Sequence, residues 1–529
     1  WVRDNLLTVP LIGYSSRLSV RPGDLIDFKV SSKHTSNYTA RLFRSVSADP
    51  NPDGAGLIEY ECDNFFPEQS FASRVQKFKP GSYAASEGPV TIKAKRSISF
   101  TVLVYPTFLG QSEQSLIDFG QFNLSLDKKG SAVFKTNQGQ AKSVITAVEK
   151  FWYRVEATVT NLGHMRVKLN RLGEDKNSKP STNQIDMKIE LSQTAPVFIA
   201  SRCADDRIQN CFNGKIEAPQ ILADNQPVAV WDFSKNISSM VVPGVGCVDL
   251  KLENMPTRAV TGMAWDASEM NWQHKPEHYA AISFHEDDIY DFNWETDFSF
   301  VIPPNMPSGA YVMRISCGDD YDAMPFFVCP KKGHTTAKLC VLVSTFTYII
   351  YGNHARPDYE ASWLDRINKW NAYPHNPANF PNYGLSTYNN HVDGSGICHA
   401  SHRRPLFNLR PGYITFGHAT CSGLRHFQAD SHLISWLHAK NIGYDVITDE
   451  ELHCDGWDAI NQYDAILTGS HPEYHTQETL DALTRYRDEG GALHYLGGNG
   501  FYWRIARHQE DPGLLEIRRA EDGLRAWAS

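Results

Sequence analysis

Tyr463-Asp-Ala-Ile-Leu-Thr-Gly-Ser-His-Pro-Glu473 is the stretch that decides the fold of the C-terminal half of this chain. Its first six residues form an apolar run with the length of a β-strand, and a polar segment with helical periodicity follows at about 476–488. In an open α/β sheet, ligands bind beyond the carboxyl ends of the strands. His471 and Glu473 stand at such a position, so both are candidate site residues.

Strands and helices alternate on both sides of this stretch. Ala337–Val343 is a continuous apolar run, which is typical of a strand that is covered on both faces. The other expected elements are strands at 444–447, 463–467 and 492–496 and helices at about 359–370, 428–440 and 476–488. This alternation predicts a doubly wound parallel sheet over residues 332–529. The order of its elements resembles the class I glutamine amidotransferase-like fold.

The first 331 residues show a different pattern. Short runs alternate apolar and polar residues with a period of two, and turns rich in Gly, Pro, Asn and Asp separate them. Leu25–Val30, Ser97–Val104 and Trp152–Val159 are examples. Such runs predict half-buried antiparallel strands, so we expect this half of the chain to be all-β.

One part of the all-β half resembles a known fold. Residues 106–231 contain a hairpin pattern at 122–136 and a strand pattern at Asn213–Ile221, and they resemble a laminin-G or concanavalin-like jelly roll. The flanking residues 1–105 and 232–331 are expected to form one Ig-like β-sandwich, which the jelly roll interrupts.

The composition limits the partners of the chain. A net charge of −9 over 529 residues, with no long basic run, disfavours a nucleic-acid-binding protein. No apolar stretch reaches the roughly 18 residues of a membrane-spanning helix, so no membrane partner is expected. Ten cysteines without regular spacing favour reduced thiols in a cytoplasmic protein. Because the chain begins at Trp1 and stops at Ser529 without a helix stop, we expect it to be a fragment.

The candidate chemistry lies in the C-terminal half, which holds 15 of the 20 histidines. Tyr351 and Tyr388 could join Glu473 at the carboxyl edge of the sheet and offer three hard oxygen donors. Holding a phenol ionised at pH 7 requires a strong local cation, because its pKa lies near 10. Two phenolates and one carboxylate would neutralise Fe³⁺. The alternative is that these tyrosines are ordinary core residues.

Several segments of this half are similar to the large, catalytic subunit of N,N-dimethylformamidase. They are Thr345–Asn353, Tyr383–Gly396, Arg403–Pro411, Leu467–Tyr474 and Asn499–Trp503. The resemblance implies a mononuclear iron held by two tyrosines and one glutamate, which fall on Tyr351, Tyr388 and Glu473. Tyr348 lies three residues before Tyr351 and is the alternative ligand.

The same resemblance implies the catalytic residues and the partners. His471 and Asn499 would lie beside the metal, the first as an acid/base or orienting group and the second as a polar anchor for the substrate. The substrate would be a small amide such as an N-substituted formamide. A small subunit and a second large subunit would complete an α2β2-type assembly. A capping or supporting role for His471 is the alternative.

Three other interpretations compete with this one. Cys398, His399 and His402, with His418 and Cys421, suggest a zinc site, but their spacing matches no standard pattern. An amidotransferase-type cysteine nucleophile is disfavoured because the strand at 492–496 leads into Gly497-Gly-Asn-Gly500, which contains no cysteine. A carbohydrate-binding or scaffold protein that acts through its jelly roll is the alternative of a different class.

Overall fold

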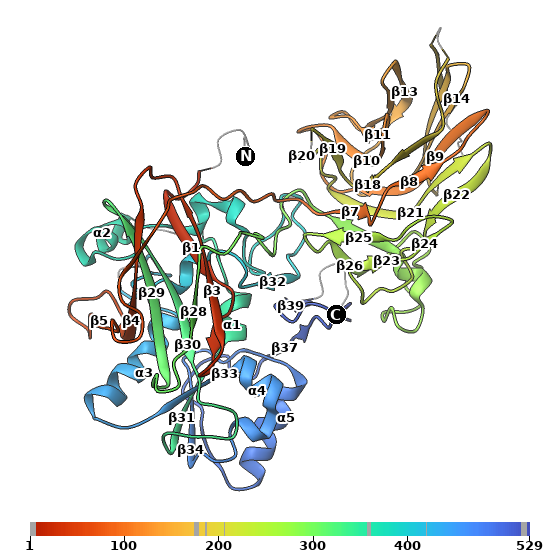
Figure 1. Ribbon diagram of the computed structural model, residues 1–529. Helices are drawn as coiled ribbons and strands as arrows, with labels where there is room; N and C mark the ends of the chain where they lie inside the picture. The colour runs from red at the N-terminus through yellow and green to blue at the C-terminus, as the bar shows by residue number, and fades with distance from the viewer. Residues whose placement is uncertain are drawn as a thin grey trace.

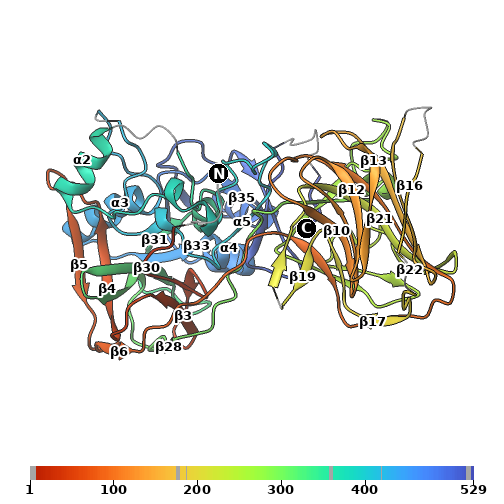
Figure 2. The same ribbon diagram turned by 90° about the horizontal axis from the view of Figure 1, so that it is seen from above.

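The computed structural model describes residues 7–173, 179–185, 188–205, 207–356, 361–418, 420–519 and 526–529. The chain forms two lobes, and its C-terminal residues lie between them (Figure 1). One lobe consists of β-strands, and the other combines a β-sandwich with an α/β sheet (Figure 2). The prediction of a mostly β, multi-sheet protein is confirmed. No helix of the described residues is long and apolar enough to cross a bilayer.

The sandwich is built from two segments that are far apart in the sequence. Its strands are β1 (Leu11–Ser15), β2 (Ser19–Val20), β3 (Leu25–Ser32), β4 (Tyr38–Ala48), β5 (Leu57–Glu61), β6 (Gln69–Phe71), β28 (Phe298–Val301), β29 (Gly309–Cys317) and β30 (Asp320–Val328). One sheet has the order β1-β3-β28, and the other runs β2-β30-β29-β4-β5. Ile26, Phe28 and Val30 alternate into the core between these sheets, as the period-2 pattern predicts.

The second lobe packs an eight-stranded sheet against a nine-stranded sheet around one large core. Its strands are β7 (Tyr83–Ser86), β8 (Val90–Ile92), β9 (Ser97–Pro106), β10 (Gln114–Phe119), β11 (Phe122–Leu126), β12 (Ser131–Thr136), β13 (Gly139–Thr146), β14 (Tyr153–Thr160), β15 (His164–Arg171), β16 (Ser181–Gln184), β17 (Gln193–Ala195), β18 (Val197–Ile199), β19 (Arg202–Ala204), β20 (Arg207–Gln209), β21 (Gly214–Ala223), β22 (Gln226–Trp231), β23 (Val241–Val242), β24 (Gly244–Val245), β25 (Leu250–Glu253), β26 (Thr257–Val260) and β27 (Ala281–Phe284). The segment 106–231 lies within this lobe, which also contains strands before and after it.

The α/β part contains four parallel strands in the order β33-β31-β34-β36. They are β31 (Leu339–Val343), β33 (Asp445–Thr448), β34 (Ala465–Thr468) and β36 (Ala492–His494). The main helices are α1 (Thr345–Ile350), α2 (Ala361–Trp370), α3 (Phe427–Ala439), α4 (Asp449–Asp455) and α5 (Gln477–Asp488). Thr476 is the N-cap of α5, and its side chain accepts from the backbone N–H of Thr479. Of the predicted helix 359–370, residues 359 and 360 lie outside the described residues.

Both faces of this parallel sheet are covered, which explains its continuous apolar strands. Val341 and Val343 of β31 pack against α3 and the sandwich, whereas Cys340 and Leu342 pack against α4 and α5. Short elements complete the lobe: η3 (Pro377–Asn379), η4 (Pro381–Tyr383), η5 (Phe407–Leu409), η6 (Gly456–Ala459), β32 (His399–Ser401), β35 (Tyr474–His475), β37 (Trp503–Arg504), β38 (Ala506–Arg507) and β39 (Leu514–Glu516). The predicted parallel sheet is therefore confirmed.

A buried cluster of histidines and aspartates joins the two lobes. His285 and Asp288 follow β27 of the second lobe, and His391 comes from the loop after η4. The ring of His391 contacts Asp287 with 2.8 Å between Nδ1 and Oδ1, and the ring of His285 lies 3.3 Å from Asp288 between Nδ1 and Oδ2. These side chains tie the loop after Tyr388 to the edge of the second lobe.

The same cluster has the composition of a metal site, because ligand atoms of His285, Asp288 and His391 lie within 4.8 Å of one another. The two rings, however, stack with 3.7 Å between centroids and 3° between planes. The nitrogen lone pairs of parallel stacked rings lie in separate planes, so a single ion cannot lie in both planes. The geometry therefore fits an ion-pair network better than a metal site. Burial disfavours the charged ring, but Asp287 and Asp288 outweigh it and raise the pKa of His391 to about 9.

We predict that His391→Gln destabilises the protein by about 3 kcal/mol at pH 7, because it leaves buried carboxylates without their cation. The folded-state pKa of His391 lies above its unfolded value. Its contribution is thus complete below about pH 6.5 and is lost as the pH rises through about 9. The difference in unfolding midpoint between wild type and variant should shrink from pH 7 to pH 10. The exposed His164, changed to Gln, is the control for removing a histidine outside this cluster.

Candidate metal centre

The two adjacent central strands of the parallel sheet deliver two of the predicted site residues to one place. Helix α1 follows β31 directly and has Tyr351 as its C-cap, and the loop after β34 carries Glu473. The backbone N–H groups of Glu473 and Tyr474 both donate to Oγ1 of Thr347, at 3.2 and 3.3 Å. A hydroxyl in the middle of α1 therefore fixes the position of the Glu473 loop.

Tyr388 reaches the same place from a loop with no regular structure. The hydroxyls of Ser386 and Thr387 donate to the carbonyl of Ile350, at 2.9 and 3.2 Å, and so satisfy an acceptor at the end of α1. This anchor brings the ring of Tyr388 onto that of Tyr351. The two rings stack with 4.0 Å between centroids and 14° between planes.

Tyr351, Tyr388 and Glu473 form what we call the Tyr–Glu cluster. The hydroxyl of Tyr351 donates to Oε2 of Glu473 at 2.7 Å, and that of Tyr388 donates to Oε1 at 3.1 Å. Glu473 is 2% exposed. The structure thus brings together three oxygen-bearing residues that are separated by 122 and 85 positions in the chain.

Tyr348 does not belong to this cluster. Its hydroxyl donates to the carboxylate of Asp430, which also accepts from the backbone N–H of Ser470. The ring of Tyr348 is fully buried against Phe327 and His426. Of the two tyrosines on α1, the structure places Tyr351 beside Glu473.

The electrostatics of the cluster keep the phenols neutral and the carboxylate charged. Burial raises the pKa of both Tyr351 and Tyr388 well above the usual value near 10. Burial also opposes ionisation of Glu473, but hydrogen bonds from His471 and Tyr351 outweigh it and lower the pKa of this carboxyl. Only a strong cation at these oxygens could remove both phenol protons at neutral pH.

The two remaining predicted residues differ in their placement. His471 lies against the cluster, with its Nε2 2.9 Å from Oε2 of Glu473 and 3.2 Å from a guanidinium nitrogen of Arg425. Asn499 is exposed in the loop after β36, with a φ of 51°. The neighbouring Gly498 donates to the carbonyl of Ser470 at 3.1 Å, which holds this loop beside the cluster. Among the described residues, no hydrogen bond from the Asn499 side chain is present.

Four residues around the cluster were not predicted. The guanidinium of Arg425 lies 4.0 Å from the ring centroid of Tyr351. The guanidinium of Arg519 lies 4.2 Å from the ring centroid of Tyr388. The hydroxyl of Tyr474 contacts that of Tyr388. His426 is buried with its ring 4.6 Å from that of Tyr351, and its Nε2 has no hydrogen-bond partner in the described structure. Of these four residues, only Tyr474 could have been suggested by the sequence, because it directly follows Glu473.

Comparisons with known proteins decide the family. The family model described as N,N-dimethylformamidase beta subunit-like, C-terminal, matches residues 257–529. The N,N-dimethylformamidase beta subunit of Paracoccus aminophilus is 34% identical over 98% of this chain and 75% of that protein. That of an Alcaligenes species is 30% identical over the same shares. The chain belongs to the N,N-dimethylformamidase beta subunit family. Membership places it among the amidohydrolases, the enzymes that act on amide C–N bonds.

Solved structures add little to this result. The LG1-3 region of the laminin alpha2 chain is 15% identical, covers 29% of this chain and 32% of that chain, and has a TM-score of 0.21. This score is too low to establish a common fold.

The donor set of the Tyr–Glu cluster fits the mononuclear iron that the resemblance implies. Two phenols and one carboxylate can supply three anionic oxygens, which match a trivalent hard cation. The unpartnered, buried Nε2 of His426 adds a polar atom beside Tyr351. In contrast, Cys398, His399, His402, His418 and Cys421 form no group that could hold a metal in the described part of the chain.

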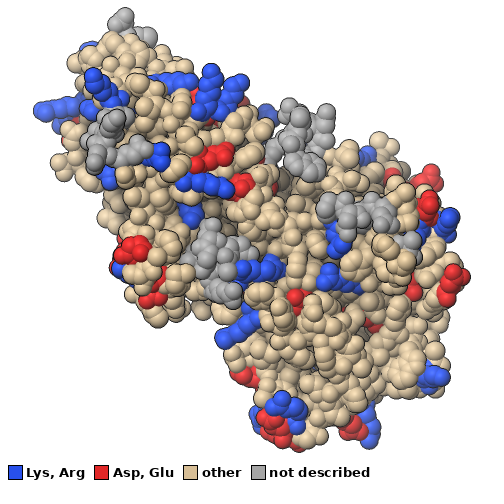
Figure 3. All heavy atoms as spheres, turned by 180° about the vertical axis from the view of Figure 1, so that it is seen from behind, with Lys and Arg blue, Asp and Glu red and all other residues tan. Residues whose placement is uncertain are grey.

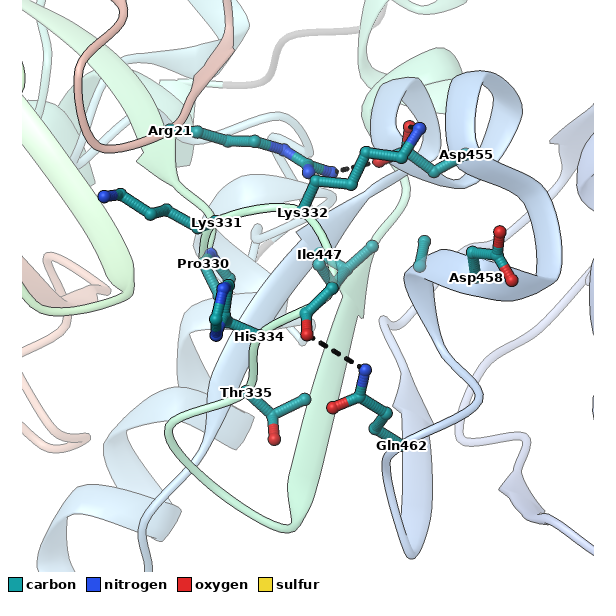
Figure 4. A pocket seen from close by; sticks show the side chains of 12 residues that line it. Arg21, Pro330, Lys331, Lys332, His334, Thr335, Ile447, Asp455, Asp458 and Gln462 are labelled. Carbon is teal, nitrogen blue, oxygen red and sulfur yellow. Dashed lines mark hydrogen bonds and ion pairs between the residues drawn. The ribbon is translucent and has the colours of Figure 1, made fainter.

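The chain also contains a pocket that is separate from the Tyr–Glu cluster. It lies between the linker 330–335 and the α4–η6 corner, and none of its lining residues belongs to the Tyr–Glu cluster (Figure 4). Asp455 contacts both Arg21 and Lys332 there, at 2.6 and 2.7 Å. The side chain of Gln462 donates to the carbonyl of Gly333 at 3.1 Å. These contacts fasten the sandwich edge and the linker to the α/β sheet.

We predict that Thr347→Val destabilises the protein by roughly 1–3 kcal/mol, because two buried backbone N–H groups lose their acceptor. Urea unfolding followed by tryptophan fluorescence measures the change. Thr347→Ser keeps the hydroxyl and is the matched control. Equal stability of the Val and Ser variants would show that Thr347 does not hold the Glu473 loop.

Proposed function

We propose that this chain carries the iron centre of a hydrolase that splits a small N-substituted formamide, such as dimethylformamide, into formate and an amine. The observation that carries the proposal is the convergence of Tyr351, Tyr388 and His471 on the buried carboxylate of Glu473. The relatives are named as N,N-dimethylformamidase subunits, which supports the substrate class.

In this proposal Tyr351, Tyr388 and Glu473 hold Fe³⁺, which supplies a Lewis acid for the amide carbonyl and for water. His471 would act as the general base and then as the general acid. Its ring nitrogen can take a proton from the attacking water and pass it to the amine nitrogen as the C–N bond breaks. The water oxygen ends on the formyl carbon, so the products are formate and the amine.

Asn499 and Arg425 have supporting roles. The amide of Asn499 would donate to the carbonyl oxygen, which gains negative charge during attack. Arg425 lies between the ring of Tyr351 and Nε2 of His471, so it fixes the orientation of the histidine. Nε2 can donate to the carboxylate of Glu473 or accept from the guanidinium of Arg425, but it cannot do both at once.

We also propose the setting in which the site works. The relatives are named as beta subunits, which supports assembly with a small subunit and a second copy of this chain in an α2β2-type enzyme. The parallel strand order of the α/β part supports a class I glutamine amidotransferase-like fold. Scattered cysteines support a cytoplasmic location. Acidic and basic side chains are interspersed on the face shown in Figure 3, without the basic patch that is typical of a nucleic-acid-binding surface.

We predict that the full-length wild-type protein contains iron, absorbs visible light through tyrosinate-to-iron charge transfer, and releases formate from dimethylformamide. Tyr388→Phe should lose the iron, the absorption and the activity together, because Phe offers no oxygen ligand. Tyr348→Phe is the matched control on α1 and should keep all three. Elemental analysis, absorption spectra and a formate assay measure these quantities. A Tyr388→Phe protein with full iron and activity would contradict the assignment.

We predict that Asn499→Ala lowers kcat by roughly 10²–10³-fold, the range for loss of one donor to a developing oxyanion. Its iron content and its charge-transfer band should stay at the wild-type values, because Asn499 makes no contact with the metal-binding residues. An unchanged kcat would remove Asn499 from the mechanism. Formamide and acetamide, assayed beside dimethylformamide, would define the substrate class.

A further inference from the structure

Tyr474 and Arg519 form a hydrogen-bonded extension of the Tyr–Glu cluster. Tyr474 is fully buried, and its hydroxyl lies in a short hydrogen bond with that of Tyr388. A guanidinium nitrogen of Arg519 donates to the hydroxyl oxygen of Tyr474 at 2.9 Å. Arg519 also donates to the carbonyl and the hydroxyl of Thr387, at 2.6 and 3.0 Å, so the residue next to Tyr388 holds the guanidinium in place.

The direction of these bonds follows from the chemistry of the groups. A guanidinium can only donate, so the oxygen of Tyr474 accepts from Arg519. The hydroxyl proton of Tyr474 then needs an acceptor. Among these hydrogen-bonded groups, the hydroxyl oxygen of Tyr388 is that acceptor. The proton of Tyr388 goes to Oε1 of Glu473 at 3.1 Å. Both tyrosine hydroxyl protons have an acceptor only when each group donates to the next in the order Arg519, Tyr474, Tyr388, Glu473.

This order is suited to a phenolate at Tyr388. When the proton of Tyr388 is lost, only the bond to Glu473 disappears, and the donor from Tyr474 remains and becomes charge-assisted. The guanidinium of Arg519 also lies 4.2 Å from the ring centroid of Tyr388, where its positive charge favours a negative ring. Two independent contacts thus stabilise the same anion.

We propose that Tyr474 and Arg519 are positioning residues that stabilise the phenolate of Tyr388 and set its donor strength toward the metal. The inference rests on the proposed iron site. Residues that hydrogen-bond to metal ligands tune both the affinity and the electronic properties of a metal. Tyr474 and Arg519 touch the ligand rather than the substrate, so their effect is expected first in the spectrum of the iron.

The test uses the full-length, iron-loaded protein and the variants Tyr474→Phe and Arg519→Gln. Each variant should retain iron, and its charge-transfer band should move to longer wavelength, because a phenolate without its donor or cation holds its electrons less tightly. In competition with a chelator, iron retention should weaken by about 10–100-fold. Arg519→Lys keeps the positive charge and should show a smaller shift than Arg519→Gln.

Tyr348→Phe is the control, because its hydroxyl bonds to Asp430 and contacts no residue of the Tyr–Glu cluster through that group. Its band should stay in place. A band at the wild-type position in both Tyr474→Phe and Arg519→Gln would overturn this inference and leave the iron site standing. The inference would also be overturned if Tyr474→Phe lost its iron while the charge-transfer band of Arg519→Gln stayed at the wild-type position. Tyr474 would then be a metal ligand. A wild-type protein without iron or band would overturn the proposed function and this inference together.

Discussion

The carboxylate of Glu473 is buried and charged, and the local structure around it exists to satisfy that charge. An ionised carboxylate out of contact with water is costly unless hydrogen-bond donors surround it. Tyr351 comes from the end of α1, Tyr388 from a loop, and His471 from the turn that carries Glu473 itself. Three segments are therefore fixed relative to one another by a single acid.

The positive charges around this acid bear on the ionisation of the two phenols. With neutral phenols the cluster carries one negative charge, and with two phenolates it carries three. Arg425 and Arg519 lie over the two rings and add positive charge on opposite sides of the cluster. They would offset part of the repulsion among these anions, and the proposed iron would offset the remainder. The arginines thus favour the anionic state, but burial keeps the metal-free phenols protonated.

The sequence predicted the features that depend on local periodicity. Continuous apolar strands that alternate with helices predicted the parallel sheet, and the rule that strand ends meet at one edge brought Glu473 near Tyr351. It could not decide between Tyr348 and Tyr351, because α1 has only six residues and all of them are buried. Nor could it place Arg425 or Arg519, whose positions depend on tertiary contacts of loops without a repeating pattern.

The loop that carries Tyr388 connects the site to the packing of the lobes. Before Tyr388, the hydroxyls of Ser386 and Thr387 fasten this loop to α1. After it, His391 is held by Asp287 of the second lobe at 2.8 Å. A loop without regular structure is otherwise a poor support for a metal ligand, because its backbone can adopt many conformations. Since one of the anchors of this loop belongs to the second lobe, the position of Tyr388 depends on how that lobe docks. The second lobe thus contributes to the geometry of the Tyr–Glu cluster.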